Sequence, residues 1–189
     1  MRGFPILLLL AACSSGPEPD VKSPYPYGRY LGALKLAEHP NASNVRTLVA
    51  MLEDPDHLAR SGAVVALAQI GRPEFAQHLI PRLDPKTETS AMVRGDVCLA
   101  LARLKNPAAI DPLLAALQSD PESVVRREAG KTLPAFGKKP AILRGLSAAV
   151  ADPDVGVAWR AHVSLQELTG AKAVAMTREA WDAWIKDHP

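Results

Sequence analysis

One turn recurs four times along this chain, and its spacing limits the folds that the chain can adopt. Each copy opens with an Asp-Pro pair and runs into small and branched apolar residues that lead to a leucine. The copies begin at Asp54, Asp84, Asp120 and Asp152. Their leucines are Leu67, Leu101, Leu133 and Leu165, which are 34, 32 and 32 residues apart. A near-constant step of this length is typical of a stacked array of structural repeats, and such arrays usually bind partners and seldom carry out chemistry.

The apolar residues of each copy follow a helical period. With the Asp counted as position zero, and four extra residues allowed in the second copy (region 86–91), they fall at positions five, nine, twelve, thirteen and sixteen. These positions lie on one face of a helix. Small side chains and valine at position nine, which let a neighbouring helix approach closely, are Ala63, Val97, Ala129 and Ala161. We expect the Asp of each pair to cap this helix, with the proline at its first position.

Shorter apolar segments, each preceded by a loop signal such as Gly71-Arg72-Pro73, predict a second helix in each repeat. These segments are Asn44–Leu52, Glu74–Leu83, Ala108–Leu117 and Ala141–Val150. The sequence therefore predicts an all-α fold, an α-α superhelix or solenoid of about four to five helical hairpins.

Two stretches carry a resemblance to a known repeat family. The first contains Asp54-Pro55-Asp56, Arg60, Ala63, Ala66-Leu67 and Ile70-Gly71, and the second contains Asp120-Pro121-Glu122, Arg126, Ala129, Leu133 and Phe136-Gly137. They resemble HEAT repeats, and within that family the short bacterial version also found in phycobilisome lyases. The resemblance covers residues 28–170 and implies much about fold but little about function.

In HEAT repeats of this kind the arginine at position six often pairs with the Asp of a neighbouring repeat. The resemblance therefore implies a ladder formed by Arg60, Arg94 and Arg126 with Asp54, Asp84, Asp120 and Asp152. The fourth copy has Ala158 at position six, which indicates that the array ends there, with Arg160 as a nearby substitute.

The first residues predict a signal peptide over residues 1–12. Arg2 precedes an apolar run, residues 6–12, that is too short to cross a bilayer as a helix. The segment Leu10-Ala11-Ala12-Cys13 resembles the lipobox of bacterial lipoproteins, which implies that Cys13 becomes the acylated first residue, carrying palmitate-like chains. We expect a lipid anchor at Cys13 in the bacterial cell envelope, at the outer membrane on its periplasmic side, because Ser14 follows. The alternatives are an uncleaved N-terminal helix with a chance cysteine, and a start codon further upstream.

Residues 13–27 predict a lipidated, proline-rich and extended linker. Its prolines, which a helix interior does not tolerate, are Pro17, Pro19, Pro24 and Pro26. The nearby tyrosines Tyr25, Tyr27 and Tyr30 either cover the first helix or touch a partner.

The C-terminal residues 171–189 predict a capping helix. Trp181, Trp184 and Ile185 share one helix face because they are three and four residues apart. This face either covers the last exposed apolar stripe of the array, as terminal repeats require, or contacts a partner.

Composition and motifs argue against chemistry and against nucleic acid. The net charge is only +2, and the charged residues are scattered along the chain. Cys98 lies between apolar neighbours on a predicted helix, and the five histidines, at positions 39, 57, 78, 162 and 188, form no metal-binding spacing. The chain has neither a Gly-rich phosphate loop nor a hydrolase elbow. We therefore expect no catalytic residue, no metal, no cofactor and no enzyme.

These observations favour a non-enzymatic, membrane-anchored scaffold that binds a protein or peptide in a groove lined by the second helices. The polar residues expected to point outward there are Gln77, His78, Arg82, Asp111, Gln118, Arg144 and Ser147. One alternative is an assembly or quality-control factor for envelope complexes. Another, implied by the lyase branch of the resemblance, is an accessory subunit that handles a bilin chromophore, although an exported protein is in the wrong compartment for it.

Overall fold

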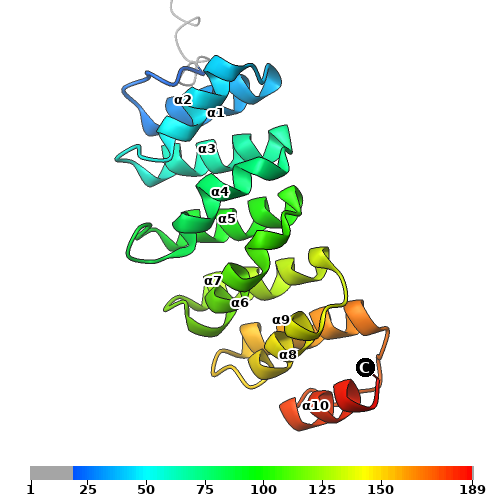
Figure 1. The fold of residues 1–189 in the computed structure, drawn as a ribbon. Helices are drawn as coiled ribbons and strands as arrows, with labels where there is room; N and C mark the ends of the chain where they lie inside the picture. Colours follow the sequence, from blue (N-terminus) through cyan, green and yellow to red (C-terminus); the bar gives the residue numbers. More distant parts are fainter. Residues whose placement is uncertain (1–18, 189) are drawn as a thin grey trace, which may run out of the picture.

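The computed structural model describes residues 19–188, and these residues form an array of stacked helical hairpins (Figure 1). The helices are α1 (Pro26–Glu38), α2 (Ala42–Met51), α3 (His57–Ile70), α4 (Ala76–Leu79), α5 (Ala91–Leu104), α6 (Ile110–Ser119), α7 (Ser123–Thr132), α8 (Pro140–Ala149), α9 (Val155–Thr169) and α10 (Arg178–Asp187). Short 3-10 helices are η1 (Pro73–Phe75), η2 (Ile80–Leu83), η3 (Pro107–Ala109) and η4 (Leu133–Phe136). No strand occurs within this range, so the predicted all-α fold is confirmed.

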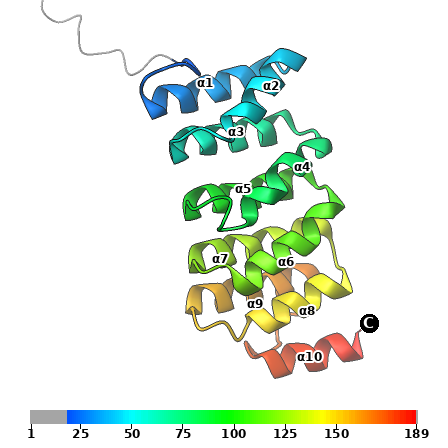
Figure 2. The same cartoon turned by 60° about the vertical axis from the view of Figure 1, so that its left-hand side comes forward.

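The helices alternate between two layers that run the length of the array. We call α1, α3, α5, α7 and α9 the A helices, and α2, α4, α6, α8 and α10 the B helices. Each A helix packs against the next A helix, and the B helices α2, α4, α6 and α8 each pack against the A helix that follows them (Figure 2). Five hairpins result, which confirms the predicted solenoid.

The apolar stripe of the A helices forms the core, as the helical period predicts. The four repeat leucines at positions 67, 101, 133 and 165 are fully buried. The position-nine residues, which include Ala63 and Val97, are also fully buried between neighbouring helices. No single hairpin can bury this stripe alone, so each repeat depends on its neighbours.

The N-cap residues of α3, α7 and α9 lie two residues after the aspartates that were expected to cap these helices. Asp56, not Asp54, caps α3 by accepting a hydrogen bond from the Leu58 backbone N–H, and Asp154 caps α9 in the same way at Val157. The prediction that the Asp of the Asp-Pro pair caps the helix was therefore wrong. Its carboxylate instead accepts the backbone N–H two residues on, as Asp54 does from Asp56 at 2.9 Å, which closes the turn before the helix.

The second helix of the α3/α4 hairpin is broken into three pieces. The sequence predicts one helix over Glu74–Leu83, but η1, the four-residue α4 and η2 occupy this segment in turn. Pro81 lacks a backbone N–H and cannot make the helical hydrogen bond, so the segment tightens into a 3-10 turn there.

The described part of the expected linker is not extended. α1 begins at Pro26, and residues 20–23 fold back across it, where the Asp20 N–H donates to the Gly28 carbonyl at 3.2 Å. A Cβ on Gly32 would lie 2.4 Å from the Val21 nitrogen, so only glycine allows this crossing. The predicted signal peptide, residues 1–12, and Cys13 lie outside the described residues.

The C-terminal helix caps the array as predicted. The Trp181 indole is fully buried, and Trp184 and Ile185 are half-buried against the same core. Ser147 on α8 donates a hydrogen bond to the Asp182 carboxylate at 2.6 Å, which joins α10 to the preceding B helix. The aromatic face therefore points into the array.

Candidate functional site

The B helices present the polar face on which the sequence predicts partner binding. Five of the seven predicted residues are exposed or half-exposed on it: Gln77, His78, Asp111, Gln118 and Arg144. Two predictions were wrong. Arg82 is only 9% exposed and forms an ion pair with Glu53. Ser147 is fully buried and donates a hydrogen bond to Asp182 on α10.

Shallow hollows separate successive B helices. One, of about 310 Å³, lies between η2 and α6, and its lining includes Leu83, Pro112 and Ala115. Another, of about 230 Å³, lies one repeat further on and is lined in part by Gln118 and Ala148. Because the hollows recur at successive hairpins, an extended partner can contact this face at regular intervals.

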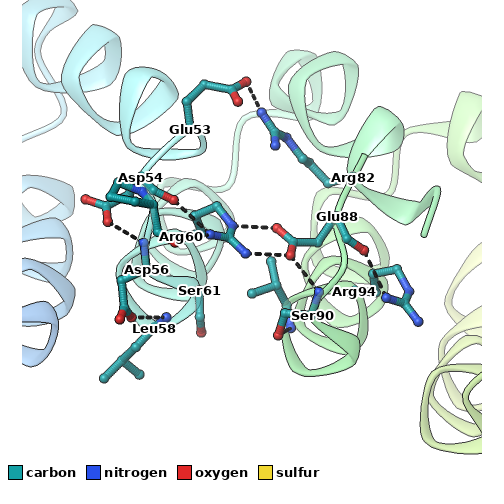
Figure 3. A network of polar contacts seen from close by, with 12 residues as sticks. Glu53, Asp54, Asp56, Leu58, Arg60, Ser61, Arg82, Glu88, Ser90 and Arg94 are labelled. Atoms are coloured by element: carbon teal, nitrogen blue, oxygen red, sulfur yellow. Dashed lines mark hydrogen bonds and ion pairs between the residues drawn. The ribbon is translucent and has the colours of Figure 1, made fainter. Parts of the chain in front are cut away.

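The most regular polar feature is a ladder of arginines that joins consecutive repeats (Figure 3). The Arg94 guanidinium donates two hydrogen bonds to the Asp120 carboxylate, both at 2.8 Å, and a third to the Glu88 backbone carbonyl at 2.9 Å. Arg126 repeats the pattern with Asp152 at 2.8 and 3.0 Å. Each arginine therefore closes its own turn and also holds the next repeat through a bidentate, charge-assisted pair.

The second rung differs from the predicted one. Arg60 pairs with Glu88 at 2.6 and 2.7 Å, whereas Asp84 is exposed and its carboxylate accepts a hydrogen bond from the Lys86 backbone N–H. The four extra residues of the second copy move the repeat register from Asp84 to Glu88, which lies six residues before Arg94. Counting back from the arginine instead of forward from the Asp-Pro pair identifies Glu88.

One rung of the ladder was not predicted from the sequence. Arg29 donates to both oxygens of Asp54, at 2.8 and 2.9 Å, and to the Ser23 carbonyl six residues earlier. Ser23-Pro24 stands in the place of the Asp-Pro pair, so the absence of an aspartate hid a first copy of the repeat. The position-six arginine was the available signal.

The ladder stops at the fourth Asp-Pro copy, as Ala158 indicates. Ala158 is buried and carries no charge, and Arg160 does not substitute for the missing arginine. Its guanidinium lies 3.8 Å from Glu167 on its own helix and 5.2 Å from the Trp159 ring centre.

Opposing effects set the protonation of the ladder carboxylates. Burial has the largest single effect and raises the pKa of Asp54 and of Glu88, but the hydrogen bonds from Arg29 and Arg60, backbone hydrogen bonds and nearby positive charges together outweigh it and leave both pKa values lowered. These two carboxylates are therefore ionised at neutral pH, and the ladder charges are paired within the array.

The reactive side chains of the described residues are mostly occupied or inaccessible. Burial raises the pKa of the Cys98 thiol to about 12, so the nucleophilic thiolate does not form at neutral pH. Burial also raises the pKa of Asp96, which accepts a hydrogen bond from Ser61 at 2.6 Å. Across residues 19–188, no three His, Cys, Asp or Glu side chains gather closely enough to hold a metal ion.

None of the helices between residues 19 and 188 has the length and apolar character needed to cross a membrane.

Stacked helical hairpins joined by a polar ladder define an α-solenoid. The chain belongs to the HEAT-repeat family, because the family model for HEAT repeats matches residues 9–89 and 86–134, more than half of its length. Among characterised proteins, deoxyhypusine hydroxylase from Rattus norvegicus is 27% identical over 132 residues. The matched segment covers 69% of this chain but only 38% of the hydroxylase, so the likeness concerns part of that protein.

Proposed function

We propose that this chain is a non-enzymatic HEAT-repeat scaffold, held at the bacterial cell envelope by a lipid on Cys13, that binds a protein or peptide along its B-helix face. The observation that carries the proposal is the division of polar groups between the two layers. The ladder uses its charges within the array, whereas Gln77, Asp111, Gln118 and Arg144 remain exposed on the B helices, and Gln118 lines one of the hollows.

A binding role is favoured over catalysis by how the potentially reactive groups are used. The Cys98 thiol is buried and protonated, and the ladder carboxylates are held by arginines. The hydroxylase activity of the rat relative is not carried over, because this chain spans 38% of that protein.

The envelope location is supported by the lipobox-like segment ending in Cys13 and by the linker that follows it. A single acyl chain holds a protein on a bilayer only marginally, whereas two or more give stable anchoring. A triacylated Cys13 would therefore retain the array on the leaflet without a membrane-spanning helix.

Photo-crosslinking in cells of the source organism tests the scaffold. A photoreactive residue at 77, 111, 118 or 144 should capture the same protein, and Arg144→Glu should weaken that capture. Matched control positions are the exposed residues Arg103 and Glu167 on A helices. Equal capture from the B-helix positions and the controls would exclude the B-helix face as the binding site.

The anchor is tested separately by growth with radiolabelled palmitate. The wild-type protein should incorporate label and sediment with membranes, and Cys13→Ala should abolish both. Label that persists in Cys13→Ala would contradict the anchor without affecting the scaffold.

A further inference from the structure

Exposed apolar side chains gather on one edge of the array. Of the eight large hydrophobic residues exposed in the described chain, six lie at the N-terminal ends of A helices. We call them the A-edge row: Tyr25, Tyr27, Met92, Val124, Val155 and Trp159. Their exposed fractions run from 40% at Val124 to 76% at Val155. The loops that precede these helix ends line the left-hand side of the array in both views (Figures 1 and 2).

The row follows from the repeat register. In four repeats an apolar residue lies four positions after the residue that opens the ladder turn. The pairs are Ser23 and Tyr27, Asp54 and Leu58, Glu88 and Met92, and Asp120 and Val124. Near α1, α3 and α5 the row borders a depression of about 700 Å³, whose lining includes Tyr27, Leu58 and Met92. An apolar position that recurs in four repeats, exposed in three of them and half-buried at Leu58, indicates a contact surface.

The charges beside the row nearly balance. Asp56, Glu122 and Asp154 lie next to it, and two of these carboxylates cap helices. The bases in the same region include Lys22, His57 and Arg127, and the Arg127 guanidinium reaches the first turn of α9 beside Gly156. The ladder arginines nearby are already paired. The edge therefore favours an occupant without a strong net charge.

The chain that leads to the proposed anchor ends at this edge. Cys13 precedes the first described residue, Pro19, by six residues, which span at most about 20 Å. Residues 20–23 then cross α1, and Tyr25 is the residue that caps its N-terminus. A lipid on Cys13 thus keeps the start of the A-edge row close to the bilayer surface. The separation is at most about 20 Å plus the short path of residues 20–23 across α1.

We propose that the A-edge row docks on the zwitterionic phospholipid surface in which Cys13 is anchored, so that the array lies along the membrane. Tyrosine and tryptophan, which prefer the bilayer interface, stand at the two ends of the row, and aliphatic side chains stand between them. Because the charges beside the row nearly balance, the row favours a zwitterionic over an anionic lipid surface. This inference rests on the proposed lipid anchor, and it leaves the B-helix face available to a protein partner.

Site-specific fluorophores on the lipidated protein test the docking. Cys98 is buried and Cys13 is occupied by lipid, so a single cysteine introduced by Val124→Cys or Val155→Cys can be labelled selectively. The matched controls are Arg103→Cys and Glu167→Cys, which are exposed on A helices away from their N-terminal ends. Each protein is anchored in phosphatidylcholine–phosphatidylethanolamine vesicles that carry a lipid-borne quencher.

We expect quenching several-fold stronger at 124 and 155 than at the two controls. A second measurement uses unlipidated Cys13→Ser protein, whose weak partitioning into the same vesicles should fall about fivefold or more when Met92→Glu and Val124→Glu are combined. That partitioning should change little between low and high salt.

Three results would overturn the inference. Equal quenching at all four positions in protein that still floats with the vesicles would remove the docking and leave the anchor intact. Shielding of 124 and 155 that appears without vesicles and grows with protein concentration would assign the row to a second copy of the chain. Shielding that requires an added protein partner would assign it to that partner. Failure of the anchor is distinguishable, because the wild-type protein would then neither incorporate palmitate nor float, and partitioning of the unlipidated protein would still decide the role of the row.

Discussion

The joints between the repeats and the two ends of the array are held together in different ways. At the central joint the Arg94 and Asp120 side chains are 2% and 1% exposed, and the same bidentate pair recurs along the stack. At the N-terminal end the covering element is backbone, where residues 20–23 cross α1 over Gly28 and Gly32. At the C-terminal end it is one large side chain, Trp181, held by a hydrogen bond to His162 at 2.9 Å.

This difference shows how a repeat array solves two separate problems. An interior repeat only needs a surface that fits a copy of itself, so one set of residues can be reused at each joint. An end must cover an apolar stripe that has no further copy to meet, so each end needs its own solution. Loss of a joint should therefore affect the whole array, whereas loss of an end should act locally first.

The largest effect should come from breaking the buried joint with Arg94→Ala. The substitution leaves the Asp120 carboxylate buried without its cation, which should lower the free energy of unfolding by about 3–5 kcal/mol. Chemical denaturation followed by circular dichroism measures the change. Arg103→Ala, on the exposed surface of the same helix, is the matched control and should be nearly neutral. A loss at Arg94 no greater than at Arg103 would mean that the ladder does not hold the joints.

The same measurement ranks the rungs. Arg29 and Asp54, at the first joint, are 16% and 12% exposed, so water compensates part of the lost pairing. Arg29→Ala should therefore cost less than Arg94→Ala, and an equal or greater cost would show that burial does not set the strength of a rung.

Trp181→Ala should have the next largest effect, at the C-terminal end. Removing the fully buried indole should cost about 3 kcal/mol and release α10 before the rest of the array unfolds. Hydrogen exchange should show faster exchange confined to α10 and the facing part of α8. Trp159→Ala removes an indole that is 52% exposed and should leave stability nearly unchanged. Uniformly faster exchange across all repeats would show that the cap and the joints form one cooperative unit.

The same distinction explains what the sequence could predict. The repeat leucines, the helical hairpins and two of the rungs follow from residues that recur at fixed spacing, and they were predicted. The Arg60–Glu88 rung was missed because an insertion separates the Asp-Pro pair from the repeat register. The path of residues 20–23 was missed because a backbone segment crossing a glycine leaves no periodic signal. Arg82 and Ser147 were expected to be exposed because spacing alone does not reveal a partner on a neighbouring element, which is Glu53 in the turn after α2 for Arg82 and Asp182 on α10 for Ser147.

Gly32→Ala tests the N-terminal end and should have a smaller effect. The new Cβ would lie 2.4 Å from the Val21 nitrogen and 2.5 Å from the Asp20 carbonyl carbon, so the backbone of residues 20–23 or α1 must move. We expect a loss of about 1–3 kcal/mol and faster proteolysis near residues 20–23. Gly95→Ala is the matched control, because its Cβ would meet only the Glu128 Cγ at 3.8 Å and alanine favours a helix interior. If both variants behave alike, the crossing does not close the array.

The smallest effect should be a pH dependence confined to the C-terminal cap. The Trp181 indole N–H donates to the His162 Nδ1, so this nitrogen must be unprotonated in the folded state. Burial lowers the pKa of His162, which has the same consequence: the folded state binds this proton less readily than the unfolded state. Stability from this group is complete above the ordinary histidine pKa of about 6.5 and is lost as pH falls from there to the lowered folded pKa. The protection factors of the α10 amides, which correct for the intrinsic slowing of exchange in acid, should therefore fall on mild acidification while those of the central repeats stay high. His162→Gln keeps a side-chain acceptor that does not titrate, so it should remove the pH dependence. Because the pKa values of Asp54 and Glu88 are lowered, these carboxylates titrate only at more acidic pH, and a simultaneous opening of the joints that they form in this window would contradict the separation of joint from end.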